Sequence, residues 1–368
     1  MTAWCHPDDR REEGSREHPL DVLEIPRYAL NDSLKAVSRL FLFTFLFLSL
    51  PTHHHAQEPF RIVFWNVENF FDTRDNPHKN DNEFLPTAKR RWTPARYRDK
   101  VEKTARTLVA TAHEGTLPKL IGLCEVENDS CLADLTRRSL LRTAGYRYLI
   151  TRSPDVRGIN VALLYQPDAF RLIQHQSIRI PHKLVKRGAT RDILHVSGIV
   201  SSGDTLDVMV CHMPSRSGGE TRSEPYRIFT AQVLKQAVDS VMHARRRPSV
   251  VVMGDFNDYP TNRSLRQVLC ADGKLMNLMA NLSAGEGTYF YQGQWGMLDQ
   301  FLVSQGMLRK RATIRTSPRQ VTVFRPSFLL VADKKHRVYK PFRTYNGLRY
   351  QGGYSDHLPI VMDLMIVE

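Results

Sequence analysis

Seven short apolar runs spread over residues 60–365 constrain the fold more than any other feature of this 368-residue chain. Each run is six or seven residues long and rich in Val, Ile, Leu, Met or Phe, which favours β-strands. Several are continuously apolar rather than alternating, which indicates sheets that are covered on both faces. The predicted strands are 60–66, 119–125, 160–165, 206–212, 249–255, 298–303 and 359–365.

Longer stretches of helical character separate these runs. Thr93-Pro94 is a cap followed by proline at the first helical position, and Gly145 is a typical helix stop. No Gly/Ser linker or repeat interrupts the chain after Pro59, so we expect one α/β domain. The predicted helices run from Pro94 to about Ala112, over 132–144, and from about Pro225 to His243.

The segment before this domain has the features of an export signal. Leu40–Leu50 is an unbroken apolar run that is too short to span a bilayer comfortably. Lys35 and Arg39 precede it as a positive flank, and Ala56 offers a small residue for cleavage. We therefore expect an exported protein, periplasmic or secreted, with no stable membrane insertion after cleavage.

These features divide the chain into three parts. Residues 1–33 are a mixed-charge leader without apolar periodicity, and we hypothesise that translation starts at Leu34. Residues 34–56 are the expected signal peptide, and 57–368 the expected catalytic domain.

Polar side chains stand at the ends of six predicted strands. If the two strands that begin with such a residue run antiparallel to the four that finish with one, all six positions meet at one rim. Loops at such a rim are free to carry ligand-binding groups. Four runs finish at Asn66, at Glu125, at His212, and at Asp255 followed by Asn257; the other two begin at Asp299 and just after Asp356-His357.

The residue types at this rim also select the metal. Glu125, Asp356 and Asn66 offer hard oxygen ligands, and none of the five cysteines lies in a C-x-x-C spacing. Such donors match Mg²⁺, with Mn²⁺ or Ca²⁺ as alternatives, rather than zinc.

Six motifs, in this chain order, resemble the endonuclease/exonuclease/phosphatase superfamily, and the blocks around the last two resemble its exported bacterial branch of extracellular nucleases. The resemblance implies an α+β four-layer sandwich, in which two mixed β-sheets pack face to face with helices on the outer faces. The motifs are N-V-E-N-F-F at 66–71, C-E-V-E-N at 124–128, C-H-M-P-S-R at 211–216, G-D-F-N-D at 254–258, L-D-Q at 298–300 and S-D-H-L-P at 355–359.

The same resemblance implies a role for each motif residue. Glu125 is expected to be the principal metal carboxylate, with Asn66 and Asp356 nearby. Asp255 is expected to orient or deprotonate the attacking water, and Asn257 to contact the phosphate.

Two histidines complete the expected catalytic set. His357 with Asp299 resembles the His–Asp pair of the superfamily, and a carboxylate beside an imidazole favours its charged form. His212 resembles the second active-site histidine, which stabilises negative charge or protonates the leaving oxygen.

Charge indicates the class of substrate. Residues 57–368 carry 46 basic and 30 acidic side chains, a net charge of +16, which favours a polyanion such as nucleic acid or an anionic lipid surface. The stretch 334–350 interleaves basic and aromatic residues, as in single-strand binding surfaces or simply a basic loop. The expected phosphate-binding residues are Arg157, Arg216, Arg343 and Arg349.

The sequence leaves several alternatives open. A phosphomonoesterase, an inositol-phosphate phosphatase and a sphingomyelinase-like phospholipase share the same core motifs, and a non-catalytic binding module would also explain the basic charge. Gly353-Tyr354-Ser355 begins like the nucleophile elbow of a serine hydrolase, but His357 stands where a glycine is needed. The oligomeric state is open, with a monomer favoured, and so is the choice between DNA and RNA.

Overall fold

The computed structural model describes residues 58–181, 189–282 and 285–368. The leader and signal peptide expected at 1–33 and 34–56 lie outside these residues. Within the described part of the chain, no helix is long and apolar enough to cross a membrane.

The first of two large sheets is built around β1 (Phe60–Phe70). β1 pairs in parallel with β2 and antiparallel with β19, so the first and last of the predicted strands lie side by side. The strand order is β13-β19-β1-β2-β4-β3, and β14 also pairs with β19. The other strands are β2 (Leu120–Val126), β3 (Arg147–Ile150), β4 (Asn160–Tyr165), β13 (Ile314–Arg315), β14 (Val321–Val323) and β19 (Ile360–Ile366).

The second sheet has the order β5-β6-β7-β8-β12-β9. β7 and β8 are parallel, and β12 runs antiparallel to β8. Both sheets are therefore mixed. The strands are β5 (Arg171–Ile178), β6 (Ile193–Ile199), β7 (Thr205–His212), β8 (Ser249–Asp255), β9 (Leu275–Asn277) and β12 (Asp299–Ser304).

The two sheets pack face to face, and their shared core explains the continuous apolar runs. Ile62 and Phe64 of β1 join a buried cluster that also contains Val208 of the second sheet. Gly122 of β2 lies so close to Met253 of β8 that a Cβ there would sit 2.7 Å from the methionine Cε. Because side chains alternate along a strand, Val63, between Ile62 and Phe64, points to the opposite face of the sheet. That outer face must be covered by other elements.

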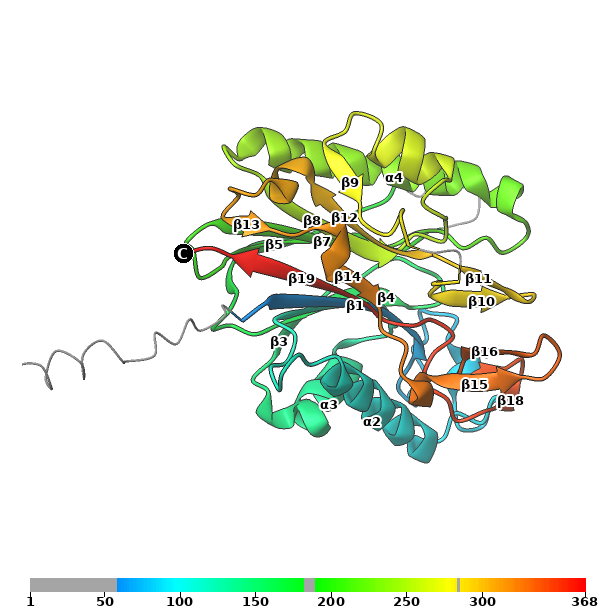
Figure 1. The fold of residues 1–368 in the computed structure, drawn as a ribbon. Helices are drawn as coiled ribbons and strands as arrows, with labels where there is room; N and C mark the ends of the chain where they lie inside the picture. Colours follow the sequence, from blue (N-terminus) through cyan, green and yellow to red (C-terminus); the bar gives the residue numbers. More distant parts are fainter. Residues whose placement is uncertain (1–57, 182–188, 283–284) are drawn as a thin grey trace, which may run out of the picture. The chain divides into compact units, whose positions relative to one another are not determined.

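Three helices cover the outer faces of the sheets. Val63 of β1 packs with Val101 of α2 (Pro94–Ala110), and α3 (Asp129–Arg137) joins the same cluster. On the other sheet, Val252 of β8 packs with Leu234 of α4 (Glu220–Ala244). Figure 1 shows α4 on one side of the two sheets and α2 with α3 on the other. The predicted α+β class is confirmed.

All seven predicted strands are present within a few residues of the predicted bounds, but two helix predictions were wrong in their bounds. The helix expected over 132–144 is α3, capped by Asn128, whose side chain accepts a hydrogen bond from the Cys131 N–H. Ser139 then donates to the Leu135 carbonyl and accepts from the Leu141 N–H, which starts a separate 3₁₀ turn.

The third helix begins at Glu220, five residues before the proline expected to open it. Ser223 donates from its hydroxyl to the backbone carbonyls of Gly219 and Glu220, and the buried Arg227 also donates to the Glu220 carbonyl. These bonds satisfy carbonyls of the first turn, whereas Pro225, in the second turn, removes the one N–H that would bond the Thr221 carbonyl.

Short elements complete the described chain. Three two-stranded hairpins, all in the C-terminal third, stand apart from the large sheets. They are β10 (Tyr289–Tyr291) with β11 (Gln294–Gly296), β15 (Leu330–Asp333) with β16 (Val338–Pro341), and β17 (Tyr345–Asn346) with β18 (Arg349–Tyr350). The short helices are η1 (Asn82–Phe84), η2 (Leu140–Thr143), η4 (Ser264–Leu269, a π-helix), η5 (Gln305–Leu308), η6 (Pro318–Gln320) and η7 (Ser327–Leu329).

Candidate active site

Strand pairing in the second sheet brings three of the predicted site residues into one row. The parallel register of β7 and β8 places His212 beside Asp255, and the antiparallel register of β12 places Asp299 on the other side of Asp255. All three are buried. The direction expected for the strand that begins at Asp299 is therefore correct.

The first sheet contributes the opposite half of the site. Asn66 and Glu125 end the apolar parts of the parallel strands β1 and β2, and β19 runs antiparallel to β1, as expected. The loop before β19 is held on β1 by two hydrogen bonds, from Ser355 Oγ to the Asn66 carbonyl (2.7 Å) and from Trp65 Nε1 to the His357 carbonyl (2.9 Å). This anchoring fixes the backbone of His357 over the end of the strand.

Most of the predicted site residues share one cavity of about 740 Å³. Asp299 lies behind His357 and does not line this cavity. Arg343 lines an adjoining cavity, and Arg349 lines neither of the two cavities. The predicted residues in its wall are Asn66, Glu125, Arg157, His212, Arg216, Asp255, Asn257, Asp356 and His357.

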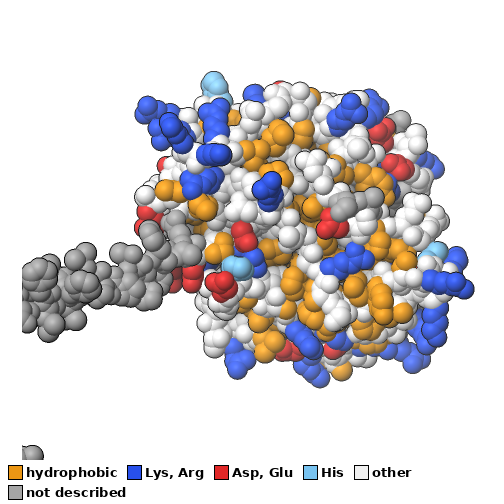
Figure 2. Space-filling model, in the orientation of Figure 1, with side chains coloured by type: hydrophobic (Ala, Val, Ile, Leu, Met, Phe, Trp, Pro, Cys, Tyr) orange, Lys and Arg blue, Asp and Glu red, His pale blue; other side chains and the backbone are white. Residues whose placement is uncertain are grey.

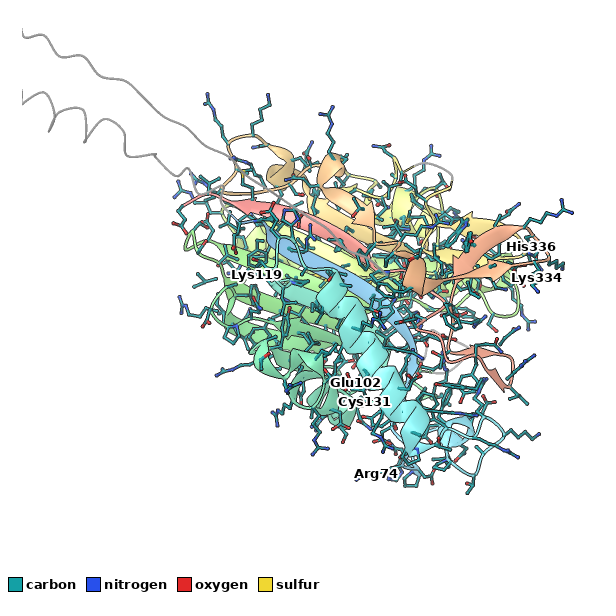
Figure 3. All side chains as sticks on the ribbon, turned by 60° about the horizontal axis from the view of Figure 1, so that its bottom comes forward. Arg74, Glu102, Lys119, Cys131, Lys334 and His336 are labelled. Carbon is teal, nitrogen blue, oxygen red and sulfur yellow. The ribbon has the colours of Figure 1, made fainter. Side chains whose placement is uncertain are left out.

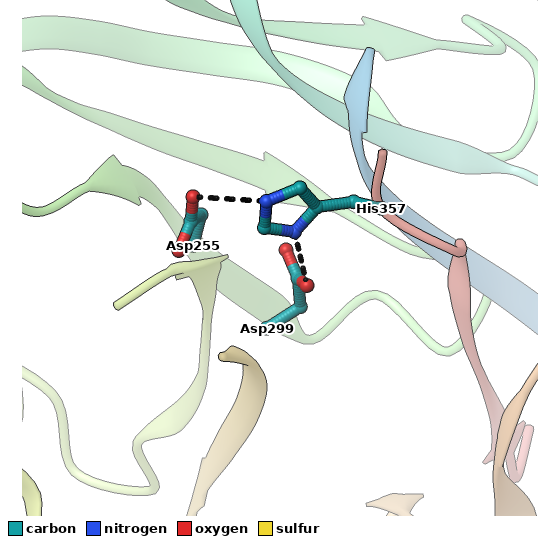
Figure 4. Close-up of side chains that lie close together, drawn as sticks. All are labelled: Asp255, Asp299 and His357. Carbon is teal, nitrogen blue, oxygen red and sulfur yellow. Dashed lines mark hydrogen bonds and ion pairs between the residues drawn. The ribbon is translucent and has the colours of Figure 1, made fainter. Parts of the chain in front are cut away.

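His357 lies between two buried carboxylates (Figure 4). Its Nδ1 is 2.7 Å from Asp299 Oδ2, and its Nε2 is 3.8 Å from Asp255 Oδ2. Burial alone lowers the pKa of His357, but the charges of Asp299 and Asp255 outweigh it and raise the pKa to about 10. The imidazole is therefore a cation at neutral pH, and its Nε2–H is directed toward the cavity wall at Asp255.

Replacing Asp299 with Asn should move the pH–rate profile of kcat toward acid. Without the carboxylate, the pKa of His357 falls, so the imidazolium loses its proton at lower pH and the alkaline limb moves down by about one pH unit or more. Asp299 also raises the pKa of Asp255, so the acidic limb should move the same way. A profile identical to that of the unsubstituted protein would mean that Asp299 does not control the charge of His357.

Besides His357, three neighbours contact the Asp255 carboxylate at the centre of the site. Oδ1 accepts the backbone N–H of Asn257 (2.9 Å), and Oδ2 accepts Asn66 Nδ2 (3.0 Å). Oδ2 also lies 3.5 Å from His212 Nε2. Burial raises the pKa of Asp255 to about 7, although His357 opposes the shift. A carboxylate with this pKa can accept a proton near neutral pH.

The two histidines differ in charge. Burial lowers the pKa of His212 well below its usual value, and the charges of Arg191 and Arg157 lower it further. His212 is therefore neutral, whereas His357 carries the positive charge. The same residue type thus has two environments within one cavity.

Glu125 is an anionic carboxylate despite its burial. Its Oε2 accepts the backbone N–H of Asn69 (2.8 Å), and Arg157 Nη1 lies 3.6 Å from its Oε1. Burial alone raises the pKa of Glu125, but Arg157 and the Asn69 hydrogen bond bring it below its usual value. The residue has a left-handed φ of 63° at a register shift of β2, which turns the strand end.

Residues 61–366 match the family model described as Endonuclease/Exonuclease/phosphatase family. The chain belongs to the endonuclease/exonuclease/phosphatase family. Its members are hydrolases that act on phosphoesters and generally depend on a divalent metal. No curated protein matches the sequence.

Solved structures with the same fold have low sequence identity to this family member. The human Nocturnin catalytic domain with a bound sulfate anion is 16% identical at a TM-score of 0.52, over 83% of this chain and 93% of that one. D. rerio TDP2 complexed with a single-strand DNA product is 14% identical at a TM-score of 0.53, covering 84% and 99%. A mannosyl-6-phosphatase from Bacteroides thetaiotaomicron is 13% identical at 0.52, covering 83% and 99%.

The donor set fits the hard divalent cation that the family uses. Glu125 and Asp356 supply carboxylates to the same cavity, and Asp356 is held by Arg343 Nη2 at 2.9 Å. Asn66 fits less directly, because its Oδ1 already accepts the Glu68 N–H and its Nδ2 donates to Asp255. One lone pair of that amide oxygen is left for a metal.

A second cluster of ligand-type atoms is better suited to proton chemistry than to a metal. One ligand atom each of Asp255, Asp299 and His357 lies within 4.8 Å of the others. With its pKa raised to about 10, His357 is protonated on both nitrogens and has no lone pair for a cation. The carboxylates of the cavity wall that could hold a metal are those of Glu125 and Asp356.

The predicted arginines have different positions in this family member. Arg157 faces Glu125, and Arg216 donates to the Asn257 carbonyl (2.7 Å) while its guanidinium lies 4.2 Å from the centroid of the Tyr259 ring. Arg343 reaches the site through Asp356. Arg349 is exposed on β18, away from the cavity.

Sequence reasoning missed several residues of the cavity wall. Arg191 is 8% exposed and donates to the Met213 carbonyl (2.6 Å), so it brings a buried positive charge to the site. Tyr259, Tyr289 and Tyr291 also line the cavity. Of these, only the aromatic cluster at 289–291, a few residues before the L-D-Q motif, could have been noticed in the sequence.

Proposed function

We propose that this protein is a divalent-metal-dependent phosphodiester hydrolase that acts on nucleic acid by direct attack of water. The observation that supports it most is the position of Asp255, whose Oδ2 faces Asn66, His212 and His357 within 3.8 Å at the cavity wall. A proton acceptor beside a buried cation is what an in-line attack on a phosphate ester requires.

Each step of the proposed reaction uses a residue of this cavity. Asp255 takes a proton from the attacking water as the oxygen–phosphorus bond forms. The His357 imidazolium stabilises the negative charge that develops on the phosphate oxygens, and neutral His212 donates a hydrogen bond there. The bond from phosphorus to the leaving oxygen then breaks, the leaving oxygen takes a proton from solvent, and Asp255 releases its proton to solvent, so no covalent enzyme intermediate forms.

The metal would be held by Glu125 and Asp356, with Asn66 as an additional oxygen donor. When bound, a hard cation would neutralise negative charge at a phosphate oxygen. The oxygen-only donor set favours Mg²⁺ over softer metals. Arg157 Nη1 lies 3.6 Å from Glu125 Oε1 in the cavity wall, where its guanidinium would also reach a bound phosphate.

Charge and fold relatives favour a nucleic acid over a small phosphate ester. The net charge of 57–368 is +16, and Figure 2 shows Lys and Arg side chains at several places around one face rather than in a single stripe. A fold relative, D. rerio TDP2, has been solved with a single-strand DNA product. The mannosyl-6-phosphatase among the relatives keeps the phosphomonoesterase as the second candidate.

Productive binding should depend steeply on salt. Arg157, Arg191 and Arg216 line the cavity and offer about three backbone contacts. With a slope of about −0.7 per contact on single strands, kcat/KM should fall on the order of tenfold between roughly 50 and 200 mM salt. A slope of log kcat/KM against log salt no steeper than about −1, together with faster turnover of a small phosphomonoester at equal metal concentration, would favour the phosphatase instead.

One experiment tests the proposed activity directly. The purified protein with Mg²⁺ is incubated with plasmid DNA, single-stranded DNA, RNA, a phosphomonoester, an inositol phosphate and sphingomyelin. We expect the highest kcat/KM on a nucleic acid. Preference for any of the last three would overturn the nuclease assignment and identify the alternative member of the family.

We further propose that the protein is exported and that its mature catalytic domain begins near Gln57. The apolar run Leu40–Leu50 and its positive flank support this. An N-terminus near Gln57 in the protein recovered from the native host would support this cleavage, and retention of Leu40–Leu50 would contradict it. Peptides from residues 1–33 in the precursor would contradict translation from Leu34.

A further inference from the structure

The hairpin β10–β11 places aromatic rings beside the active site. Its two-residue turn has positive φ at both positions, 47° at Gln292 and 88° at Gly293, as in the tight turns that suit the twist of a hairpin. Side chains alternate along β10, so Tyr289 and Tyr291 share one face. Phe290 on the other face packs against Trp295 at 5.4 Å between ring centroids, which holds the hairpin rigid.

The two tyrosines continue the active site outward. Tyr289 forms a backbone bridge with His357, and their rings lie 4.8 Å apart. The Tyr291 ring is nearly parallel to that of Tyr289, with centroids 6.5 Å apart and planes at 17°. Tyr291 is nevertheless 62% exposed, so one aromatic face is open to a ligand in the cavity.

A second cavity of about 370 Å³ adjoins the first at this hairpin. Tyr289, Tyr291 and Asp356 line both, so the two cavities meet beside the proposed metal carboxylate. Residues of β10–β11 and of the hairpin β15–β16 supply most of the wall of the second cavity. Figure 1 shows these two hairpins as neighbours, and Figure 3 shows Lys334 and His336 at the tip of β15–β16. His336 contacts Phe290 at 5.9 Å between ring centroids, which ties the two hairpins together.

The second cavity has the chemistry of a backbone-binding site. Its wall sets the cations Lys335, Lys340 and Arg343 against two carboxylates, with Lys340 paired to Asp333 (2.8 Å) and Arg343 to Asp356 (2.9 Å). A small monoester would occupy only the space around Asp255. A chain with a phosphate at every unit would fill both cavities, with a planar group passing the exposed tyrosine.

We propose that Tyr291, backed by Tyr289, is a stacking platform for an unpaired base next to the scissile phosphate, and that the adjoining cavity binds the backbone of the neighbouring nucleotide. This inference rests on the proposed function and names its substrate class, a single-stranded polynucleotide. Bases in a duplex have both faces covered by their neighbours, so they cannot stack on a protein ring without being unstacked first.

The test uses the full-length protein and a short single strand with one cleavable linkage, all others being phosphorothioates. Tyr291→Ala should raise KM on the order of tenfold, with a smaller change in kcat, because base–aromatic stacking is lost. Tyr291→Phe keeps the ring and should restore KM. Tyr339→Ala is the matched control, since Tyr339 is 64% exposed but lines neither cavity.

A substrate with an abasic position beside the cleavable linkage separates stacking from general damage to the site. On this substrate the KM of the unsubstituted protein should rise by the same factor as the KM of Tyr291→Ala rises on the intact strand. The KM of Tyr291→Ala on the abasic strand should rise no further. If Tyr291→Ala matches the unsubstituted protein on the intact strand, or if the two losses multiply, the platform is overturned while the nuclease assignment stands. If the unsubstituted protein cleaves no strand at all, the proposed function falls, and the platform with it.

Discussion

Asp255→Asn is expected to lower kcat by at least about 10²-fold while leaving the fold intact, because general-base catalysis contributes roughly 10² to 10⁴. Asparagine preserves the shape and can still accept a hydrogen bond from the Asn257 N–H, but it cannot take a proton from water. The buried carboxylate also repels Asp299, so its removal should not destabilise the domain. Steady-state kinetics and thermal unfolding of the same samples measure the two effects separately.

The matched control is Asp272→Asn, which removes a surface carboxylate paired with Lys235 and Lys274 far from the cavity wall. Its kcat should stay within about twofold of the original, since surface substitutions rarely act at a distance. An Asp255→Asn enzyme with comparable turnover would transfer water activation to another group and remove the main support for the proposed reaction.

Chelation with EDTA should abolish activity, and the smaller change Glu125→Gln should raise the Mg²⁺ concentration needed for half-maximal rate on the order of tenfold or more. The substitution removes the charge that draws the cation but keeps an oxygen that can accept the Asn69 N–H. Titrations of kcat with Mg²⁺ measure this half-maximal concentration, and Mn²⁺ and Ca²⁺ serve as comparison ions.

Glu127→Gln is the control for this prediction. Glu127 lies two residues further along and accepts the Asp72 N–H (2.7 Å), and it does not line the cavity. Burial raises its pKa to about 8, so a neutral amide resembles its state near neutral pH. The metal requirement of this variant should not change. Full turnover of the unsubstituted protein in EDTA would contradict the metal assignment itself.

The strands and the rim of the site were predictable because one physical rule governs both. A strand covered on both faces must be apolar along its length, so a polar residue marks its end, as at Asp255 and His212. Parallel and antiparallel pairing then collects these ends at one edge. The motif resemblance added the roles of the residues, which burial and charge alone would not assign.

The remaining features depend on tertiary contacts that no local pattern encodes. The start of α4 depends on Arg227, whose guanidinium pairs with the buried Asp258 at 2.7 Å. Arg191 looks like any strand-flanking arginine in sequence and becomes part of the site only through the loop after β7. Arg349 shares the basic–aromatic pattern of its neighbours but lies on the far strand of a small hairpin.

The pairing of β1 with β19 has a consequence for biogenesis. The hydrogen bond from Trp65 to the His357 carbonyl joins residues 292 positions apart, so the imidazolium reaches Asp255 only after nearly the whole domain has been synthesised and docked. A nascent chain that has not reached residue 356 lacks both Asp356 and His357 of the proposed site. We therefore expect turnover only from the completed domain, so that turnover recovered after refolding would report closure of the domain rather than formation of any one strand.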